Sequence, residues 1–229
     1  MVLSHAMDND KQGEIMTARY TLHGFFMSGP TYKVGLMLTL CGEAFDYVSV
    51  NLREGQHKTP EFLALNRYGQ VPALVDTSNG RALCQSGAIL DYLADKTGQF
   101  GGATLDDRLR AREWLFWGWD RLDAPIYRLR GWKRGFRQFD ASQVAMYEAE
   151  RKAALDVLEQ WFASGHNWLA GEQPTIADID LFGVVVYADE SGDDLSAFPA
   201  IRGWMDRVAA LPNFAPPATL LPPESRKAG

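Results

Sequence analysis

Two hydroxyl residues, Ser28 and Thr31, are spaced as a redox enzyme spaces two cysteines at the start of a helix. A dithiol oxidoreductase needs Cys-x-x-Cys there, because the helix N-terminus lowers the pKa of the attacking thiol. Hydroxyls cannot exchange disulfides, so a protein dithiol is excluded. A hydroxyl beside a helix N-terminus can instead donate a hydrogen bond to the thiolate of a bound ligand. The alternative is that Ser28 or Thr31 only caps the helix, which spacing alone favours.

A second polar pair, Gln85 and Ser86, opens a predicted helix. The N–H groups and the dipole of a helix N-terminus favour a carboxylate, and the Ser86 hydroxyl supplies one more donor. We predict that Ser86 caps this helix and that the pair binds an anionic group. The two roles are compatible, because a cap can also contact a ligand.

The segment Gly69-Gln70-Val71-Pro72 leads into a short apolar run. Proline cannot donate to a sheet ladder, so it belongs at the first residue of a strand or at a sheet edge. If the Val71-Pro72 bond is cis, the backbone N–H and C=O of Val71 face a cleft, where they can pair with an extended peptide. A trans bond is the more common alternative, and position alone does not decide between them.

The elements that must position these residues follow from hydrophobic periodicity. Apolar residues three and four apart between Val34 and Cys41 predict a helix that ends at Gly42. Further helices are predicted to begin at Thr59-Pro60 and at Ser86. Strands are predicted over residues 19–23, 45–52, 73–76 and 81–84, with Asn79-Gly80 as a hairpin turn. The first two strands and the helix between them imply a right-handed parallel crossover.

The domain organisation changes after residue 98. Residues 1–16 have no periodicity and are predicted to form a disordered extension, 17–98 hold the strands, and 99–105 form a linker. Residues 106–229 are predicted to be all helical, with a proline-rich tail. We expect Pro125 to break one apolar helix stripe. Thr175 and Asp178 form a capping box for a central helix, which stabilises it by about 1 kcal/mol.

Taken together, these motifs resemble the soluble glutathione S-transferase family. The motifs are Met27-Ser28 before Lys33-Val34, His57-Lys58 before Thr59-Pro60-Glu61-Phe62, the Val71-Pro72 strand start, and Gln85-Ser86. The resemblance covers residues 19 to about 214 and is to bacterial, serine-dependent members similar to the theta and phi classes. Tyrosine-dependent classes place a phenol where this chain has His23-Gly24. The implied fold is an α/β thioredoxin-like domain with a mixed four-stranded sheet, followed by an all-α domain.

The resemblance also implies roles for individual residues. Ser28 corresponds to the catalytic hydroxyl that stabilises the glutathione thiolate, with Thr31 as the alternative. The other implied glutathione contacts are His57 and Lys58 for the glycyl carboxylate, Gln70, Val71 and a cis Pro72 for the peptide backbone, and Gln85 and Ser86 for the γ-glutamyl end.

Aromatic residues suggest a co-substrate site between the two domains. We assign to this apolar site Phe26, Met27, Trp117 and Trp132. A basic cluster follows in the sequence, and we expect it to be a solvated face, with binding of an acidic co-substrate as the alternative. Its members are Arg128, Arg130, Lys133, Arg134 and Arg137.

The activity implied by the resemblance is conjugation, as in detoxification. The thiolate of glutathione, acting as co-substrate, attacks an electrophilic carbon of a small apolar or aromatic molecule. A glutathione-dependent disulfide or peroxide reductase and a non-catalytic glutathione-binding protein of the same fold remain as alternatives. The resemblance further implies a homodimer.

Composition excludes other kinds of partner. A net charge of -6 over 229 residues argues against binding to nucleic acid or to an anionic membrane surface. No apolar run approaches the roughly 18 residues of a membrane span. Cys41 and Cys84 have neither metal-site nor dithiol spacing, so we expect no metal and two free thiols. A cytoplasmic location is therefore expected.

Overall fold

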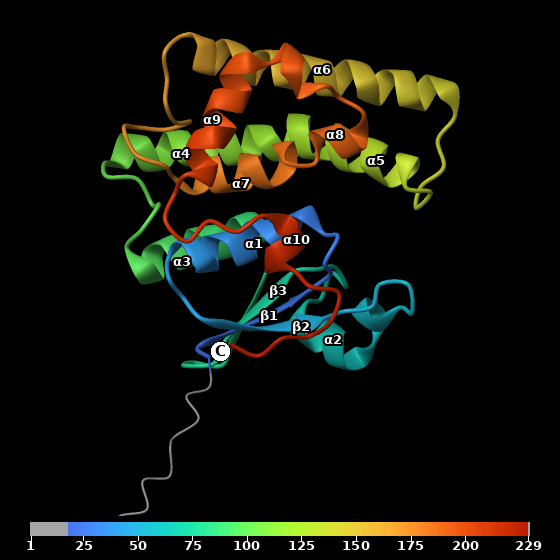
Figure 1. Ribbon diagram of the computed structural model, residues 1–229. Coiled ribbons are helices and arrows are strands. Elements are labelled where there is room, and N and C mark those ends of the chain that lie inside the picture. Colours follow the sequence, from blue (N-terminus) through green and yellow to red (C-terminus); the bar gives the residue numbers. More distant parts are fainter. Residues whose placement is uncertain (1–17, 229) are drawn as a thin grey trace, which may run out of the picture.

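The computed structural model describes residues 18–228, which form an α/β half and a helical half packed on each other (Figure 1). The extension predicted at residues 1–16 lies outside this described part. The α/β half contains β1 (Tyr20–Gly24), α1 (Gly29–Leu40), β2 (Phe45–Ser49), α2 (Pro60–Leu65), β3 (Ala73–Asp76), β4 (Arg81–Cys84) and α3 (Ser86–Thr97). The helical half contains α4 (Leu105–Trp117), α5 (Asp123–Lys133), α6 (Ala141–Ala163), α7 (Ile176–Val185), α8 (Ala188–Ser191), α9 (Pro199–Ala209) and α10 (Pro217–Leu220).

The sheet has the strand order β2-β1-β3-β4. β1 pairs parallel with β2 and antiparallel with β3, and β3 forms a hairpin with β4. The predicted mixed four-stranded sheet of a thioredoxin-like domain is thus confirmed. β3 and β4 have the predicted bounds. Pro72 directly precedes the first residue of β3, and Gly80, at φ 69°, forms the turn between the two strands.

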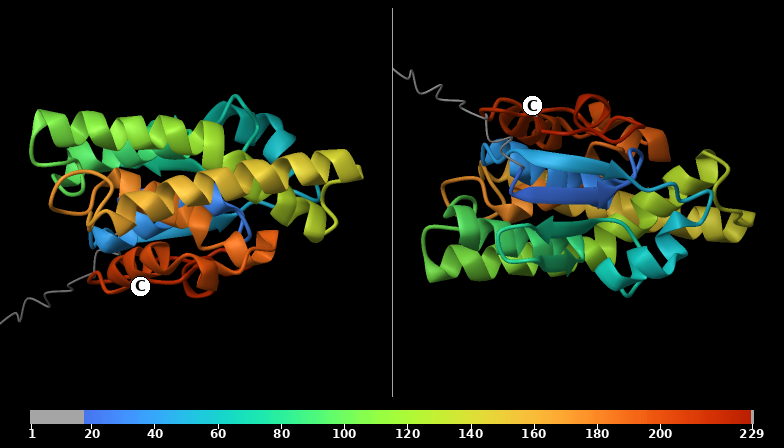
Figure 2. Two further views of the ribbon diagram at one scale, coloured as in Figure 1. Left: turned by 90° about the horizontal axis from the view of Figure 1, so that it is seen from above. Right: turned by 90° about the horizontal axis from the view of Figure 1, so that it is seen from below.

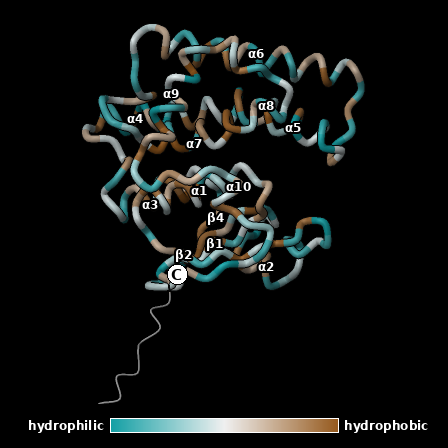
Figure 3. Tube along the Cα trace, viewed as in Figure 1, coloured by the Kyte–Doolittle hydropathy of each residue, from teal (hydrophilic) through white to brown (hydrophobic). Residues whose placement is uncertain are grey.

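The core continues from the sheet into the helical half. α1 and α3 lie between the sheet and the layer that contains α4 and α7 (Figure 1), and both pack on α7. α7 is buried along its whole length, as its apolar run predicts. Figure 3 shows α7 among the most apolar segments, whereas the outer helix α6 mixes polar and apolar residues. Phe62 of α2 packs separately, with Val50 and Ala73.

Pro125 does not break the helical path, contrary to our expectation. α4 ends at Trp117, and a π-helical turn, Gly118–Leu122, leads directly into α5. The N–H of Asp123 bonds to the carbonyl of Gly118, five residues earlier. Pro125 lies in the first turn of α5, where hydrogen bonds that span five residues give way to bonds that span four. Proline has no N–H to donate, and this position tolerates its absence.

The proline-rich tail packs back onto the α/β half. α10 contacts α1, and Arg226 exchanges two backbone hydrogen bonds of 2.7 and 2.8 Å with Tyr47 of β2. Figure 2 shows the tail along the flank of the molecule, beside the blue α1 and β2. The sequence analysis grouped this tail with the helical half, because prolines carry no periodicity that would predict the contact. Within residues 18–228, no helix is long and apolar enough to cross a membrane.

Candidate functional site

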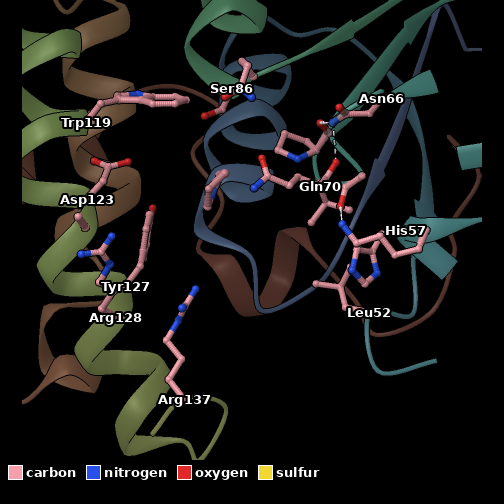
Figure 4. Close-up of a pocket in the computed structure, with 17 residues that line it drawn as sticks. Leu52, His57, Asn66, Gln70, Ser86, Trp119, Asp123, Tyr127, Arg128 and Arg137 are labelled. Carbon is pink, nitrogen blue, oxygen red and sulfur yellow. Dashed lines mark hydrogen bonds between the residues drawn. The ribbon is translucent and has the colours of Figure 1, made fainter. Parts of the chain in front are cut away.

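A cavity of about 710 Å³ lies between the two halves (Figure 4). One wall comes from the α/β half and contains all the residues predicted to bind glutathione except the two candidate catalytic hydroxyls, Ser28 and Thr31. These are His57, Lys58, Gln70, Val71, Pro72, Gln85 and Ser86. They come from three separate segments of the chain, which the fold brings together in one wall.

The loop before β3 is held open toward this cavity. The Val71–Pro72 bond is cis. Asn66, which is buried, donates to the carbonyls of Gln70 and Pro72 at 2.6 and 3.2 Å. Neither backbone group of Val71 has a hydrogen-bond partner in the described part of the chain. The N–H and C=O of Val71 therefore remain available to an extended ligand.

The start of α3 forms a second polar part of the same wall. The helix is capped by Gln85 and not by Ser86, which is a correction to our prediction. Gln85 has φ 71°, a left-handed value unusual for a residue with a side chain. Ser86 becomes the first helical residue, and its buried Oγ has no hydrogen-bond partner among residues 18–228. A buried hydroxyl without a partner, at a helix N-terminus, points to an anionic ligand group.

His57 and Lys58 lie at the opposite end of this wall, in a short 3₁₀ turn. Burial, followed by the charge of Lys58, lowers the pKa of His57, which favours the neutral imidazole. The buried Nδ1 of His57 has no partner in the described chain. Lys58 donates from Nζ to the carbonyl of Gly69 at 2.8 Å. The other two N–H groups of its ammonium remain available to a ligand. The pair offers one cation and one neutral ring to the cavity.

Ser28 and Thr31 differ in their access to the cavity. Ser28 is the N-cap of α1, and its Oγ accepts the N–H of Thr31 at 3.2 Å, which leaves its own hydrogen free to donate. Thr31 is fully buried, and its Oγ1 accepts the N–H of Phe25. Neither lines the cavity, although Pro30, which lies between them in the sequence, does.

The helical wall of the cavity contains residues that the sequence analysis did not assign. Trp119, Asp123 and Tyr127 follow one another at a spacing of four, and Figure 4 shows them one above the other on this wall. The hydroxyl of Tyr127 donates to the carbonyl of Gly183 at 2.9 Å, and burial raises its pKa well above 10. The Tyr127 hydroxyl is therefore protonated and bonded to the backbone of α7.

Asp123 belongs to a buried charge cluster that joins the two halves. Lys33 of α1 contacts Asp123 at 2.7 Å and Asp180 of α7 at 3.0 Å, and the Lys33 side chain is completely buried. Burial raises the pKa of Asp123 to about 7 despite the opposing effect of Lys33, and it also raises the pKa of Asp180. One lysine therefore balances two carboxylates that prefer to share a proton.

The four residues assigned to the co-substrate do not line this cavity. Phe26 and Trp132 are half-buried away from it, the backbone carbonyl of Met27 binds Arg130, and Trp117 lines a neighbouring cavity of about 580 Å³. Trp117 is the last residue of α4, whereas Trp119 lies within the π-helical turn and Asp123 follows it, and these two line the cavity. The spacing of four from Trp119 to Tyr127 was the available signal.

No metal site accompanies the cavity. The described residues contain no group of three or more histidine, cysteine, aspartate or glutamate side chains that could hold a metal ion.

Comparison with known proteins identifies the family. The family model "Glutathione S-transferase, N-terminal domain" matches residues 18–95, and "Glutathione S-transferase, C-terminal domain" matches residues 114–212. The chain is 30% identical over 186 residues to the disulfide-bond oxidoreductase YfcG of Escherichia coli K12, with 79% of this chain and 86% of the relative covered. It is 31% identical over 202 residues to a maleylacetoacetate isomerase of Pseudomonas aeruginosa, with 84% and 92% covered.

A solved structure gives the same result. The crystal structure of a glutathione S-transferase from Pseudomonas fluorescens Pf-5 superposes with a TM-score of 0.82 at 33% identity, and covers 88% of this chain and 100% of that one. The chain belongs to the glutathione S-transferase family.

Proposed function

We propose that this chain binds glutathione in the cavity between its halves and joins the glutathione sulfur to an electrophilic small molecule. One observation carries the proposal: the unpartnered Ser86 Oγ, the free backbone groups of Val71 and the Lys58 ammonium line a single wall. A short peptide with a carboxylate at each end is complementary to that wall. Membership of the family supports the same ligand.

In the proposed complex, each part of glutathione has its own partner. The γ-glutamyl carboxylate lies at Gln85 and Ser86, where the N-terminus of α3 provides positive charge. The cysteinyl backbone pairs with Val71, and the glycyl carboxylate binds Lys58 and the neutral His57. This leaves the sulfur directed toward the start of α1, where Ser28 is the N-cap.

Ser28 is the proposed activator of the thiol, and the burial of Thr31 favours this choice between the two hydroxyls. The thiol of glutathione releases its proton to solvent, and the Ser28 O–H donates to the resulting thiolate. The sulfur then attacks an electrophilic carbon: a carbon–sulfur bond forms, and the leaving group departs with its electron pair. Free thiols are only a few per cent ionised at neutral pH, so lowering the pKa is the main chemical contribution of the protein.

A substrate panel tests the proposal. Wild-type protein is assayed with glutathione and an aryl halide, a mixed disulfide or an organic peroxide. We expect turnover of the aryl halide, and Ser86→Ala should raise the KM for glutathione about tenfold, because an anchor to a charged group is lost. Ser142→Ala, on the exposed end of α6, is the control. Tight glutathione binding without any turnover would instead identify a binding protein.

A glutathione-dependent reductase is the second candidate, and the name of the Escherichia coli relative favours it. In this reaction the bound thiolate attacks a disulfide sulfur or a peroxide oxygen and not a carbon. The mixed disulfide and peroxide in the same panel identify this activity.

We also propose that the protein is a homodimer, on the basis of family resemblance and of one apolar surface. α4 exposes Leu105, Leu109 and Phe116, of which Phe116 is 76% exposed. The spacings of four and seven residues place all three side chains on one face of the helix.

A further inference from the structure

The basic cluster of residues 128–137 divides in the structure into paired and unpaired cations. Arg130 and Arg134 both bind Glu190, at 2.5 and 2.7 Å. Arg128 and Arg137 form no ion pair with any residue of the described chain, and both line the cavity between the halves. Both side chains are exposed, and several other arginines of the described residues also lack a carboxylate partner. What distinguishes Arg128 and Arg137 is that they lie together at one cavity.

Both side chains are positioned by neighbouring residues. The Nη1 of Arg128 donates to the hydroxyl of the buried Tyr147 at 3.0 Å, and its guanidinium carbon lies 5.1 Å from the centre of that ring. The stem of Arg137 crosses α5 at Gly131, where an added methyl group would lie 3.2 Å from the Arg137 Cδ. Figure 4 shows the guanidinium of Arg137 directed into the cavity.

The proposed glutathione contacts do not use these two arginines. In the proposed complex the carboxylates of glutathione are bound on the opposite wall, by Lys58 and by the N-terminus of α3. On the arginine wall, the carboxylate that lines the cavity is Asp123, and its Oδ2 is already bound to Lys33. The indole of Trp119 provides an aromatic surface on the same wall.

We propose that the co-substrate carries a carboxylate, which Arg137 and Arg128 bind while its aromatic or apolar part rests on Trp119. This inference depends on the proposed function and specifies its substrate class. The sequence analysis gave two alternatives for the basic cluster, a solvated face and the binding of an acidic co-substrate. For Arg128 and Arg137 this inference favours the second. Planar guanidinium groups match carboxylate geometry and are fully charged at neutral pH.

The test measures binding, so it does not require turnover. S-benzylglutathione and S-(4-carboxybenzyl)glutathione are titrated into the protein by calorimetry. We expect wild-type protein to bind the carboxylate ligand about tenfold more tightly, as one charge-assisted contact provides. Arg137→Gln and Arg128→Gln should each reduce this ratio, and the double variant should bring it near one, with S-benzylglutathione affinity unchanged. Arg134→Gln, whose arginine is paired with Glu190, is the matched control and should keep the wild-type ratio.

Three outcomes overturn the inference while leaving the proposed function intact: equal affinities in wild type, a preference that survives the double substitution, or an equal loss for both ligands in Arg137→Gln. The last result would assign Arg137 to glutathione itself. Failure of wild-type protein to bind S-benzylglutathione would contradict the proposed function and, with it, the acid-binding site.

Discussion

At the scale of single residues, Gln85 holds a backbone conformation that its side chain disfavours. Its φ of 71° and ψ of 112° precede the unpartnered hydroxyl of Ser86. Such conformations cost about 1 to 3 kcal/mol and persist where the surrounding structure fixes them. Gln85 and Ser86 both line the cavity, so this conformation stands where binding is proposed.

Replacing Gln85 by glycine separates these two effects. Glycine adopts a positive φ without a steric penalty. We therefore expect Gln85→Gly to raise the free energy of unfolding by about 1 kcal/mol and to weaken glutathione binding, because the amide contact is lost. Denaturant unfolding and calorimetry measure the two quantities. A variant that unfolds more easily than wild type would show that Gln85 is not strained.

At the scale of elements, the start of α7 illustrates a cap that does more than end a helix. The carboxylate of Asp178 accepts from the N–H of Thr175 at 2.8 Å, from Leu169 N at 3.0 Å and from the indole of Trp204 at 3.0 Å. It therefore joins α7, α9 and the preceding loop. Burial raises its pKa to about 6, against the opposing effect of these donors.

Substitutions at the two residues of this capping box should destabilise the protein by different amounts. Thr175→Ala removes the cap bond from the N–H of Ala177 and the bond from the Thr175 hydroxyl to Asp178, and should cost about 1 kcal/mol of unfolding free energy. Asp178→Ala leaves several buried donors unpaired and should cost about 3 kcal/mol or more. Chemical denaturation of both variants makes the comparison, and similar costs would contradict a connecting role for Asp178.

The sequence predicts the elements better than it predicts the walls of the site. Pro72, Asn79 and Gly80 act locally, so β3 and β4 could be bounded from sequence alone. The helical wall could not, because a π-helical turn inserts one extra residue per turn and shifts the phase of every later side chain. Asp123 and Tyr127, which follow this turn, were therefore not predicted to line the cavity.

At the scale of the whole molecule, the Lys33 cluster joins two halves that each provide one wall of the cavity. α1 supplies the lysine, and α5 and α7 supply the two aspartates. Removing one partner of a buried ion pair leaves an uncompensated charge, whereas surface pairs contribute little. The cluster should therefore hold the relative position of the two walls.

Lys33→Met should cost about 3 to 5 kcal/mol of unfolding free energy at pH 8. The pKa of Asp123 is about 7 in the folded protein and about 4 when unfolded. Because the pKa of Asp123 is higher in the folded state than in the unfolded state, protonation of Asp123 stabilises the fold. The free-energy cost of burying the ionised carboxylate is therefore complete above pH 7 and disappears toward pH 4. The deficit should thus shrink at pH 5. Lys152→Met, which removes an exposed pair with Asp156, is the control. A deficit that does not change with pH would contradict this explanation.

The proposed dimer should depend on the exposed face of α4. Phe116→Glu places a charge on that face and should shift the protein toward a monomer of 25.6 kDa. Val157→Glu, at a 43% exposed position on the outer helix α6, should leave the mass at twice that value. Sedimentation equilibrium measures both, and wild-type protein that is monomeric at micromolar concentration would exclude the dimer.

The central claim is that Ser28 lowers the pKa of bound glutathione. Its most direct test is the thiolate absorbance of the complex, titrated with pH in wild type, Ser28→Ala and Thr31→Ala. A hydrogen bond to a charged acceptor provides about 1.5 to 3 kcal/mol, and each 1.36 kcal/mol moves a pKa by one unit. We expect a shift of about one to two units in wild type and Thr31→Ala, and its loss in Ser28→Ala with glutathione affinity nearly unchanged. If the thiolate persists at low pH in Ser28→Ala and disappears only in Thr31→Ala, Ser28 is a helix cap alone and the claim is wrong.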